Sequence, residues 1–373
     1  MKNKIYKYDF LIIGAGLIGA IAALALVKKK FKVLVIDKKN SINKDNRTLA
    51  VNANSVDFLK KLGIWNKLKI KPQPINKIVI QDNHNTQDLV FENDKESMGN
   101  VIFNKDMHKI AIKKLEKLKI LVSGINFNIC EVLPNKNLII NKKNYIFKKV
   151  IVSIGKNIIS NKNHKSVVFD QQHHSHVGFF KHSVNHKNIA YEFFTHEGPL
   201  AVLPSPNYNK KSSTFIYSSK EKINKSNIQK LINEKISESH GKLIFDSSIY
   251  QYPITPHILK NNKNYIYIGD SLKSIHPVAG QGWNLGIKDI QTLCKLLDQY
   301  TIEAKNFNST YYSRRIVESV VYLSFTSVLN FLYENKSSLN TRIIKFGFNS
   351  LVNFKFARDL FIKQAMGRSN LTD

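Results

Sequence analysis

Cysteine is scarce in this chain of 373 residues. Cys130 and Cys294 are the only two, and neither lies at metal-ligand spacing, which argues against a disulfide framework and against a structural zinc site. Thiols suit a reducing compartment, so we expect a cytoplasmic protein. The length suits two domains with an ample core.

Acidic residues are few as well, because 27 Asp and Glu stand against 57 Lys and Arg, for a net charge of +30. Such an excess indicates a nucleic-acid or anionic-membrane partner when it gathers on one face. Here the lysines run from Lys2 to Lys363, and no RNA-binding or zinc-finger motif accompanies them. A compositional bias at surface positions explains them better, and we expect no nucleic acid partner.

The one long apolar run that we find, residues 10–27, follows three lysines, as in a secretion signal. Its internal order instead favours a strand over residues 8–13, a glycine turn, a helix over residues 20–27 and a second strand over residues 32–36. No small-residue cleavage site follows. We therefore interpret the region as a strand, turn, helix and strand unit.

Glycine is sparse, yet seven of the 16 glycines lie in two clusters. The first cluster, Gly14, Gly16 and Gly19, has the Gly-x-Gly-x-x-Gly spacing that lets a dinucleotide diphosphate approach a helix N-terminus. Asp37 ends the next expected strand, where its carboxylate can accept a hydrogen bond from a ribose hydroxyl. These residues predict dinucleotide binding, and the acid favours FAD or NAD over NADP.

Arginine is rarer still, with six in the chain, and Arg47 is the only one in the first 313 residues. In a chain that fills its basic positions with lysine, a lone arginine indicates that a planar fork of donors is needed for a phosphate or a carboxylate. A surface arginine in a loop is the alternative.

The second cluster follows an expected strand over residues 265–268, which ends in Gly269 and Asp270. A glycine-rich stretch, residues 276–286, then runs into a helix. An acid at a strand tip followed by a helix start offers one acceptor and several N–H donors in one place. This arrangement suits a ribityl chain and the pyrimidine edge of a flavin.

At these residues the chain resembles the flavin aromatic-ring hydroxylases of the para-hydroxybenzoate hydroxylase type, and especially the ubiquinone-biosynthesis hydroxylases. Further similarity at residues 45–47, 62–65, 194–204 and 365–367 extends the resemblance over nearly the whole length. The residues that match the second flavin motif are Gly269, Asp270, His276, Pro277, Ala279, Gly280, Gln281, Gly282, Asn284, Leu285, Gly286 and Asp289.

The resemblance implies which residues bind FAD. Arg47 would contact the cofactor and Asp270 would take the ribityl chain. The ADP half would lie on Gly14, Gly16, Leu17, Ile18, Gly19 and Asp37, and the flavin ring on Pro277, Gly280, Gln281, Gly282 and Asn284. No side chain is assigned as a catalytic base.

The implied fold is α/β with an α+β substrate part. A Rossmann-like FAD-binding domain would comprise residues 1–72, 99–165 and 258–310. A discontinuous β-sheet substrate domain would comprise residues 73–98 and 166–257, and a helical C-terminal tail residues 311–373.

The implied activity is that of a monooxygenase, which hydroxylates the ring of a polyprenylated phenol in ubiquinone biosynthesis through a flavin C4a-hydroperoxide. Molecular oxygen is a co-substrate, with NAD(P)H or another electron donor. A flavin-binding accessory protein of the quinone-biosynthesis assembly is the alternative, and other proteins of that pathway are candidate partners in either case.

Two departures from the family pattern bear on that activity. Relatives carry an acid after a mid-chain strand, where this chain has Ile154 followed by Gly155 and Lys156. A weakened nicotinamide contact, a different electron donor and lost hydroxylation are the open consequences. Likewise, Ser271, Leu272 and Lys273 replace the usual Ala-Ala-His.

Two further stretches leave open interpretations. The histidines at 173, 174 and 176 lack a carboxylate or cysteine at ligand spacing, so we expect a polar run and no metal. Residues 342–361 interleave phenylalanines with basic residues, which suits either an interfacial helix at the inner face of a membrane or a helix packed on the flavin domain.

Overall fold

The computed structural model describes most of the chain. The described residues are 4–39, 47–82, 87–93, 95–160, 164–169, 173–195, 197–206, 209–276, 280–334 and 337–368.

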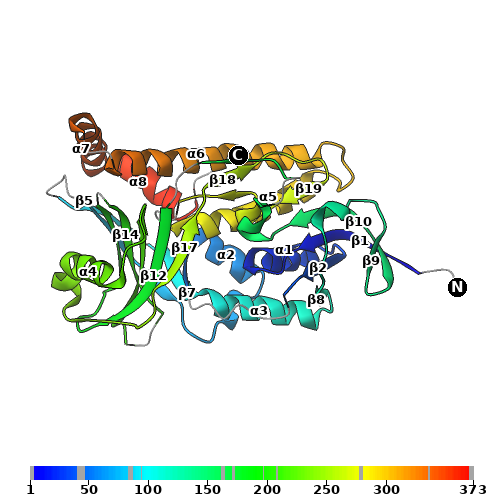
Figure 1. Cartoon of the computed structure of the whole chain (residues 1–373), viewed down its shortest axis with the longest axis horizontal. Coiled ribbons are helices and arrows are strands. Elements are labelled where there is room, and N and C mark those ends of the chain that lie inside the picture. Colours follow the sequence, from blue (N-terminus) through cyan, green and yellow to red (C-terminus); the bar gives the residue numbers. More distant parts are fainter. Residues whose placement is uncertain are drawn as a thin grey trace.

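A largely parallel sheet forms one half of the molecule (Figure 1), with strand order β19-β10-β1-β2-β8. Both faces of this sheet are covered by apolar clusters, which explains why its strands read as nearly continuous apolar runs. The strands are β1 (Ile5–Ile13), β2 (Val33–Asp37), β8 (Leu121–Ser123), β10 (Lys143–Val152) and β19 (Tyr265–Tyr267), with β9 (Leu138–Ile140) antiparallel to β10.

Three helices pack on one face of this sheet: α1 (Leu17–Lys28), α3 (Asn104–Lys117) and α5 (Gly282–Gln299). Helix α1 connects β1 to the neighbouring parallel strand β2. The strand, turn, helix and strand unit predicted at the N-terminus is confirmed, and the observed helix starts three residues earlier than expected.

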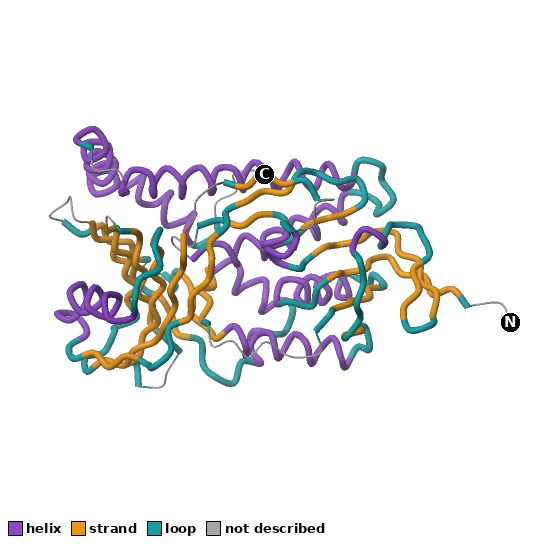
Figure 2. The backbone as a smooth tube through the Cα atoms, viewed as in Figure 1, coloured by secondary structure: helices purple, strands orange, loops and turns teal. Residues whose placement is uncertain are grey.

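An eight-stranded, mainly antiparallel sheet forms the other half (Figure 2), in the order β16-β12-β15-β14-β13-β5-β6 with β17 beside β12. Helix α4 (Lys225–His240) covers one face, because Ile228, Ile232 and Ile236 repeat every four residues and pack on it. The strands are β5 (Lys77–Asp82), β6 (Leu89–Glu92), β12 (His173–His182), β13 (Ile189–Thr195), β14 (Gly198–Pro204), β15 (Ser212–Ser219), β16 (Leu243–Phe245) and β17 (Tyr250–Ile254).

All eight strands lie within the two segments expected for the substrate domain, although the exact domain boundaries stay a prediction. Two small sheets, β3-β7-β4 and β11-β18-β20, complete the strand structure. Their strands are β3 (Thr48–Asn52), β4 (Gln73–Ile75), β7 (Gly99–Phe103), β11 (Ser166–Val168), β18 (His257–Leu259) and β20 (Lys273–Ser274), and helix α2 (Ala53–Lys61) follows β3.

The C-terminal region is helical, as predicted. Helix α6 (Phe307–Glu334) extends along both halves of the molecule (Figure 1), followed by α7 (Ser338–Asn353) and α8 (Lys355–Ala365). The Tyr333 hydroxyl donates to Asp82 of β5 at 3.0 Å. The backbone N–H of Asn54 donates to the carbonyl oxygen of Met366 at 3.1 Å, which joins the residue after α8 to α2.

Helix α6 corrects the expectation that the chain has no second long apolar span. Residues Phe307–Tyr333 have the length and hydropathy of a membrane span, with a best window of mean hydropathy 1.4, of which 29% is buried. Length and composition do not distinguish such a helix from one packed on a globular protein. Here Arg315 and Glu318, both buried, attach the first half of α6 to the parallel-sheet half.

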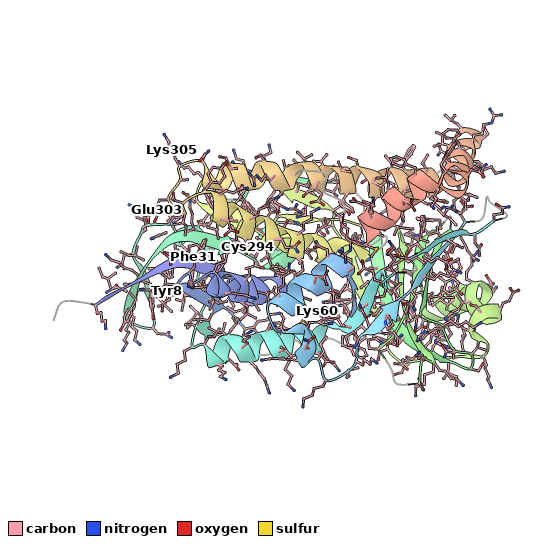
Figure 3. All side chains as sticks on the ribbon, turned by 180° about the vertical axis from the view of Figure 1, so that it is seen from behind. Tyr8, Phe31, Lys60, Cys294, Glu303 and Lys305 are labelled. Carbon is pink, nitrogen blue, oxygen red and sulfur yellow. The ribbon has the colours of Figure 1, made fainter. Side chains whose placement is uncertain are left out.

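Basic side chains are spread over the surface, in keeping with a compositional bias. Lys60 on α2 and Lys305 in the loop after α5 lie well apart from each other, as Figure 3 shows. Cys130 and Cys294 are both free thiols. Burial raises the pKa of the Cys294 thiol to about 11, so this sulfur stays protonated at neutral pH.

Candidate functional site

The first glycine turn is shaped by close backbone contacts. Gly14 has a φ of +103°, and a Cβ there would lie 2.3 Å from the Ser153 carbonyl oxygen at the end of β10. A Cβ on Gly19 would lie 2.1 Å from the carbonyl oxygen of Gly14. Both positions therefore require glycine so that α1 can approach the sheet.

Gly16 differs from its two neighbours, because a Cβ at this N-cap of α1 would meet nothing within 4 Å. The first N–H groups of a helix have no partner within the helix and carry a partial positive charge. Open space beside Gly16 at such a helix N-terminus fits the diphosphate of a dinucleotide, so the residues present fit the implied FAD.

The two glycine clusters, about 250 residues apart in sequence, meet at Ile18. A Cβ on Gly269 would lie 3.2 Å from Ile18 Cγ2, and a Cβ on Gly286 would lie 2.9 Å from Ile18 Cδ1. Ile18 thus packs on the backbone of the second cluster, while Leu17 is buried in the core. The sequence suggested that the two glycine clusters form one split site, and the structure brings the two clusters together.

Asp37 lies at the end of β2 and supports the first turn. Its carboxylate accepts from the backbone N–H of Ala15 at 2.5 Å and from that of Lys39 at 2.7 Å. The carboxylate is half-buried. Its predicted contact with a ribose hydroxyl stays a prediction.

Arg47 and Asp270 come from distant parts of the chain, and both lie near Lys156. The Arg47 guanidinium stacks on the ring of Tyr252 of β17, with its central carbon 4.5 Å from the ring centroid. Asp270 has an exposed side chain, and its backbone oxygen accepts from His257 Nε2 at 3.0 Å. Stacking is a second use of a planar guanidinium that lysine does not share. The predicted contacts of Arg47 and Asp270 with the cofactor stay predictions.

The second glycine stretch is described only in part, since Pro277 lies outside the described residues. Gly280 has a φ of +60°, Gln281 is the N-cap of α5, and Gly282 is its first residue. Asn284 is buried, donates through Nδ2 to the carbonyl oxygen of Ala50 at 2.9 Å, and accepts through Oδ1 from the backbone N–H of Asn52 at 3.0 Å. Asn284 therefore attaches α5 to β3, and a contact with the flavin ring is not needed to explain it.

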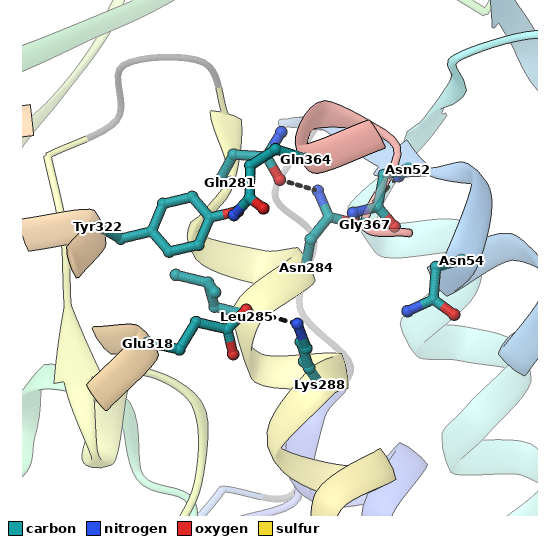
Figure 4. Close-up of a pocket in the computed structure, with 10 residues that line it drawn as sticks. All are labelled: Asn52, Asn54, Gln281, Asn284, Leu285, Lys288, Glu318, Tyr322, Gln364 and Gly367. Atoms are coloured by element: carbon teal, nitrogen blue, oxygen red, sulfur yellow. Dashed lines mark hydrogen bonds and ion pairs between the residues drawn. The ribbon is translucent and has the colours of Figure 1, made fainter. Parts of the chain in front are cut away.

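A polar pocket lies beside the start of α5, between α2, α6 and the end of α8 (Figure 4). Two of its residues, Tyr322 and Gln364, were not predicted from the sequence: Gln364 Nε2 donates to the Tyr322 hydroxyl at 2.5 Å. Its lining residues are Asn52, Asn54, Gln281, Asn284, Leu285, Lys288, Glu318, Tyr322, Gln364 and Gly367.

A cluster of buried charged side chains stabilises the second glycine turn at Gly269. Asp289 of α5 is fully buried and accepts from the backbone N–H of Gly269 at 2.8 Å, from Lys273 Nζ at 2.5 Å and from Arg315 Nε at 2.7 Å. Arg315 also contacts Glu318, which accepts from Lys288 at 2.6 Å. Burial lowers the pKa of the Lys273 ammonium to about 8, against the opposing attraction of Asp289.

The Ser271-Leu272-Lys273 departure is thereby explained, since Lys273 joins this cluster. The other departure is the apolar Ile154 in place of the family acid, and the next residue along the chain contacts the second glycine turn. Gly155 has a φ of +67°, its carbonyl oxygen accepts from Ser271 Oγ at 3.3 Å, and Lys156 follows it into the site.

Three histidines outside the 173–176 stretch, His182, His186 and His240, belong to the packing of the eight-stranded sheet and its helix α4. The rings of His182 and His240 lie 4.6 Å apart and His182 lies 5.8 Å from the Phe180 ring. Burial lowers the pKa of His240 to about 3 and that of His186 to about 4, so both rings are neutral. Within the described residues, no group of three or more His, Cys, Asp or Glu side chains could hold a metal ion.

Comparison with known sequences shows which family this chain belongs to. The family described as "FAD binding domain" matches residues 7–122 and 167–316. The ubiquinone hydroxylase UbiM of Neisseria meningitidis is 24% identical over 78% of this chain and 68% of that protein. The ubiquinone biosynthesis monooxygenase COQ6 of Caenorhabditis elegans is 24% identical over 94% and 93%, and the 3-demethoxyubiquinol 3-hydroxylase of Escherichia coli is 24% identical over 96% and 94%.

Solved structures show the same fold. The p-nitrophenol 4-monooxygenase of Pseudomonas putida superimposes with a TM-score of 0.73 over 98% of this chain and 99% of that one, at 13% identity. The flavin-dependent brominase Bmp2 gives a TM-score of 0.76 over 98% and 94%, at 12% identity.

Fold and family together define the class, an FAD-dependent monooxygenase. The chain belongs to the FAD-binding-domain family, and its predicted resemblance to the ubiquinone-biosynthesis flavin hydroxylases is confirmed.

The contrast between Gly14 and Gly16 gives a test of the first turn. We expect Gly14→Ala to destabilise the fold, because its Cβ overlaps backbone. Gly16→Ala should destabilise the apoprotein much less than Gly14→Ala, by no more than the loss of a favoured N-cap residue, yet weaken FAD binding about 10- to 100-fold through lost close contacts with a charged group. Fluorescence titration with FAD and thermal unfolding measure the two effects.

Gly347→Ala is the matched control, because Gly347 lies in α7 and a Cβ added there would meet nothing within 4 Å. It should leave FAD affinity unchanged and make the fold no less stable, because alanine is more favourable than glycine inside a helix. Full FAD affinity in Gly16→Ala would contradict a diphosphate site at this N-cap.

The ion cluster gives a second test. Asp289→Asn leaves Lys273 and Arg315 buried without their shared carboxylate, and we expect it to lower the free energy of unfolding by about 3–5 kcal/mol. Lys273→Met should cost less, because Asp289 keeps Arg315 and the Gly269 N–H. Urea unfolding measures both.

Asp298→Asn on the same helix is the control, since this exposed carboxylate pairs only with Lys29 among the ion pairs of the described residues. A surface pair contributes about 0–1 kcal/mol. Equal effects of Asp289→Asn and Asp298→Asn would refute the role of the cluster.

Proposed function

We propose that the protein hydroxylates the aromatic ring of a polyprenylated phenol, a quinone precursor in ubiquinone biosynthesis, with molecular oxygen and a reduced donor as co-substrates. The observation that carries the proposal is the meeting of the two glycine clusters at Ile18, in a chain that matches ubiquinone hydroxylases over nearly its whole length. FAD, when bound and reduced, would supply the oxygen chemistry.

The protein's own contribution would be to bind, orient and exclude water. Directly paired strand residues point to the same face of a sheet. Tyr217 pairs with His176 and packs toward α4, so the neighbouring pair Ser218 and Ser175 faces the other way. Ser175 also pairs with Tyr252, on which Arg47 stacks.

The face opposite α4 is therefore the one turned toward the cofactor site. His173 on this face lies 5.2 Å from His276 of the second motif, ring to ring. Further residues of the same face, by register, are the buried Val177, Ala201 and Glu192 and the half-buried Ile216. We propose that this face shields the flavin ring and contacts the substrate.

The electron donor in this proposal is NADH, NADPH or another reductant. The choice is this wide because the apolar Ile154 replaces the family acid and cannot accept the hydrogen bonds that the acid would accept. The same substitution favours the second candidate, an accessory flavoprotein that acts with other quinone-biosynthesis proteins and does not turn over.

A deletion experiment tests the pathway, and a reduction experiment separates the two candidates. Cells that lack the protein should lose ubiquinone and accumulate a prenylated intermediate with one ring oxygen fewer, as measured by mass spectrometry. The purified holoprotein should be reduced anaerobically by NADH, NADPH or reduced ferredoxin. An unchanged quinone pool would contradict the pathway, and a flavin that stays oxidised with all three donors would favour the accessory role.

Membrane association would give the enzyme access to a polyprenylated substrate. The sequence left two interpretations of residues 342–361 open, a helix packed on the protein and a helix at a membrane surface. The tail has buried and exposed phenylalanines, so it has features of both. Phe361 packs inward and stacks on Phe91 at 4.4 Å, whereas Phe346 and Phe356 are each 77% exposed. Exposed apolar residues also repeat along α6 at helical spacing, at Val317, Val321, Phe325 and Val328.

Cations accompany this apolar surface, since Arg342, Lys345 and Lys355 are exposed on α7 and α8. Apolar and basic side chains together suit the surface of an anionic membrane. We propose that α6 to α8 bind the inner face of the membrane peripherally.

The double variant Phe346→Ser with Phe356→Ser should bind anionic liposomes roughly tenfold or more weakly in sedimentation, because each inserted ring contributes about 1 kcal/mol or more. Ile139→Ser removes another strongly exposed apolar residue, from β9, and should bind like the wild type. Equal binding by all three proteins would exclude this surface as the membrane contact.

A further inference from the structure

Two cations from distant parts of the chain lie on neighbouring residues of β17. The ammonium of Lys156, which is half-buried, donates to the carbonyl oxygen of Pro253 at 3.3 Å. Arg47 stacks on the adjacent Tyr252. The strand thereby holds both side chains at one place.

This place lies where the two glycine clusters meet. Lys156 belongs to the short helix η3 (Gly155–Ile158), which packs on η4 (Gly269–Ser271) through the Ser271 to Gly155 hydrogen bond. On its other side, the preceding residues Ser153 and Ile154 contact Gly14, whose Cβ would lie 3.2 Å from the Ile154 nitrogen. Lys156 therefore lies between the first glycine turn and the turn that carries Asp270.

The local charge favours an anion. Burial lowers the pKa of Lys156, the Asp270 carboxylate raises it, and Arg47 lowers it again, so all three charges act on one another. Two cations and one carboxylate leave a positive charge among these three groups. Where the relatives in the resemblance carry an acid, this chain has the apolar Ile154, and it adds a cation two residues later.

We propose that Lys156 is a cofactor-binding residue, which binds the diphosphate of FAD together with Arg47. A half-buried ammonium gives a stronger charge-assisted hydrogen bond to phosphate oxygen than an exposed one would. The loss of the family acid then strengthens cofactor retention, because no carboxylate at position 154 competes for Lys156 or repels the diphosphate. This inference rests on FAD binding and not on hydroxylation, so its tests measure binding alone.

Substitution of Lys156 tests the proposal on the intact chain. Lys156→Gln should raise the FAD dissociation constant about 10- to 100-fold, as expected for one hydrogen bond to a charged group. It should also flatten the dependence of that constant on salt, because one cation fewer is screened. Lys156→Arg, which keeps the charge, should stay within about threefold of the wild type.

Lys117→Gln is the matched control, because Lys117 is an exposed lysine at the end of α3. It should keep both the affinity and the salt dependence. Thermal unfolding of each apoprotein checks the fold. Unchanged affinity and unchanged salt dependence in a folded Lys156→Gln would overturn the proposal.

A second measurement needs no variant. Amine acetylation of the wild-type protein, followed by peptide mass spectrometry, should label Lys156 several-fold less with FAD bound than after FAD removal. Lys117 should be labelled equally in both states. Equal labelling of Lys156 in the two states would overturn the assignment, whether or not the protein proves to be a hydroxylase.

Discussion

The carboxylate of Asp289 is the interaction on which the candidate site depends most. It is fully buried and joins the Gly269 turn, strand β20 through Lys273, and helix α6 through Arg315. A buried charge is tolerable only when it is paired and hydrogen-bonded, and here three donors share one acid. One residue thereby fixes where the second glycine turn, α5 and α6 lie with respect to each other.

The contact of the two glycine clusters depends on that arrangement. Gly269 can approach Ile18 because no side chain intervenes, and its turn is held by the N–H bond to Asp289. Gly14 and Gly19 do the same for α1 against the end of β10. Glycines at these contacts serve close packing, whereas Gly16 leaves open space at a helix N-terminus, so the clusters combine structural and binding roles.

The sequence predicted the N-terminal β-α-β unit and the pairing of the two glycine clusters, because the local spacing of apolar residues and glycines indicates both. Family resemblance predicted the two-part fold and the helical tail. The sequence did not predict the partner of Lys273, because that partner, Asp289, belongs to helix α5. Only the structure shows that the two side chains are paired. Likewise, Asn284 and the histidines at 182 and 240 act in packing that only tertiary contacts reveal. The role of Pro277 stays a prediction.

The central claim is that the two glycine clusters form one FAD site. Its most direct test is the flavin content of the purified chain, released by denaturation in the dark and quantified by chromatography with authentic FAD, FMN and NAD as standards. The account predicts one FAD per chain. A chain that carries no flavin and binds none when FAD is added, or one that retains NAD in its place, would contradict it.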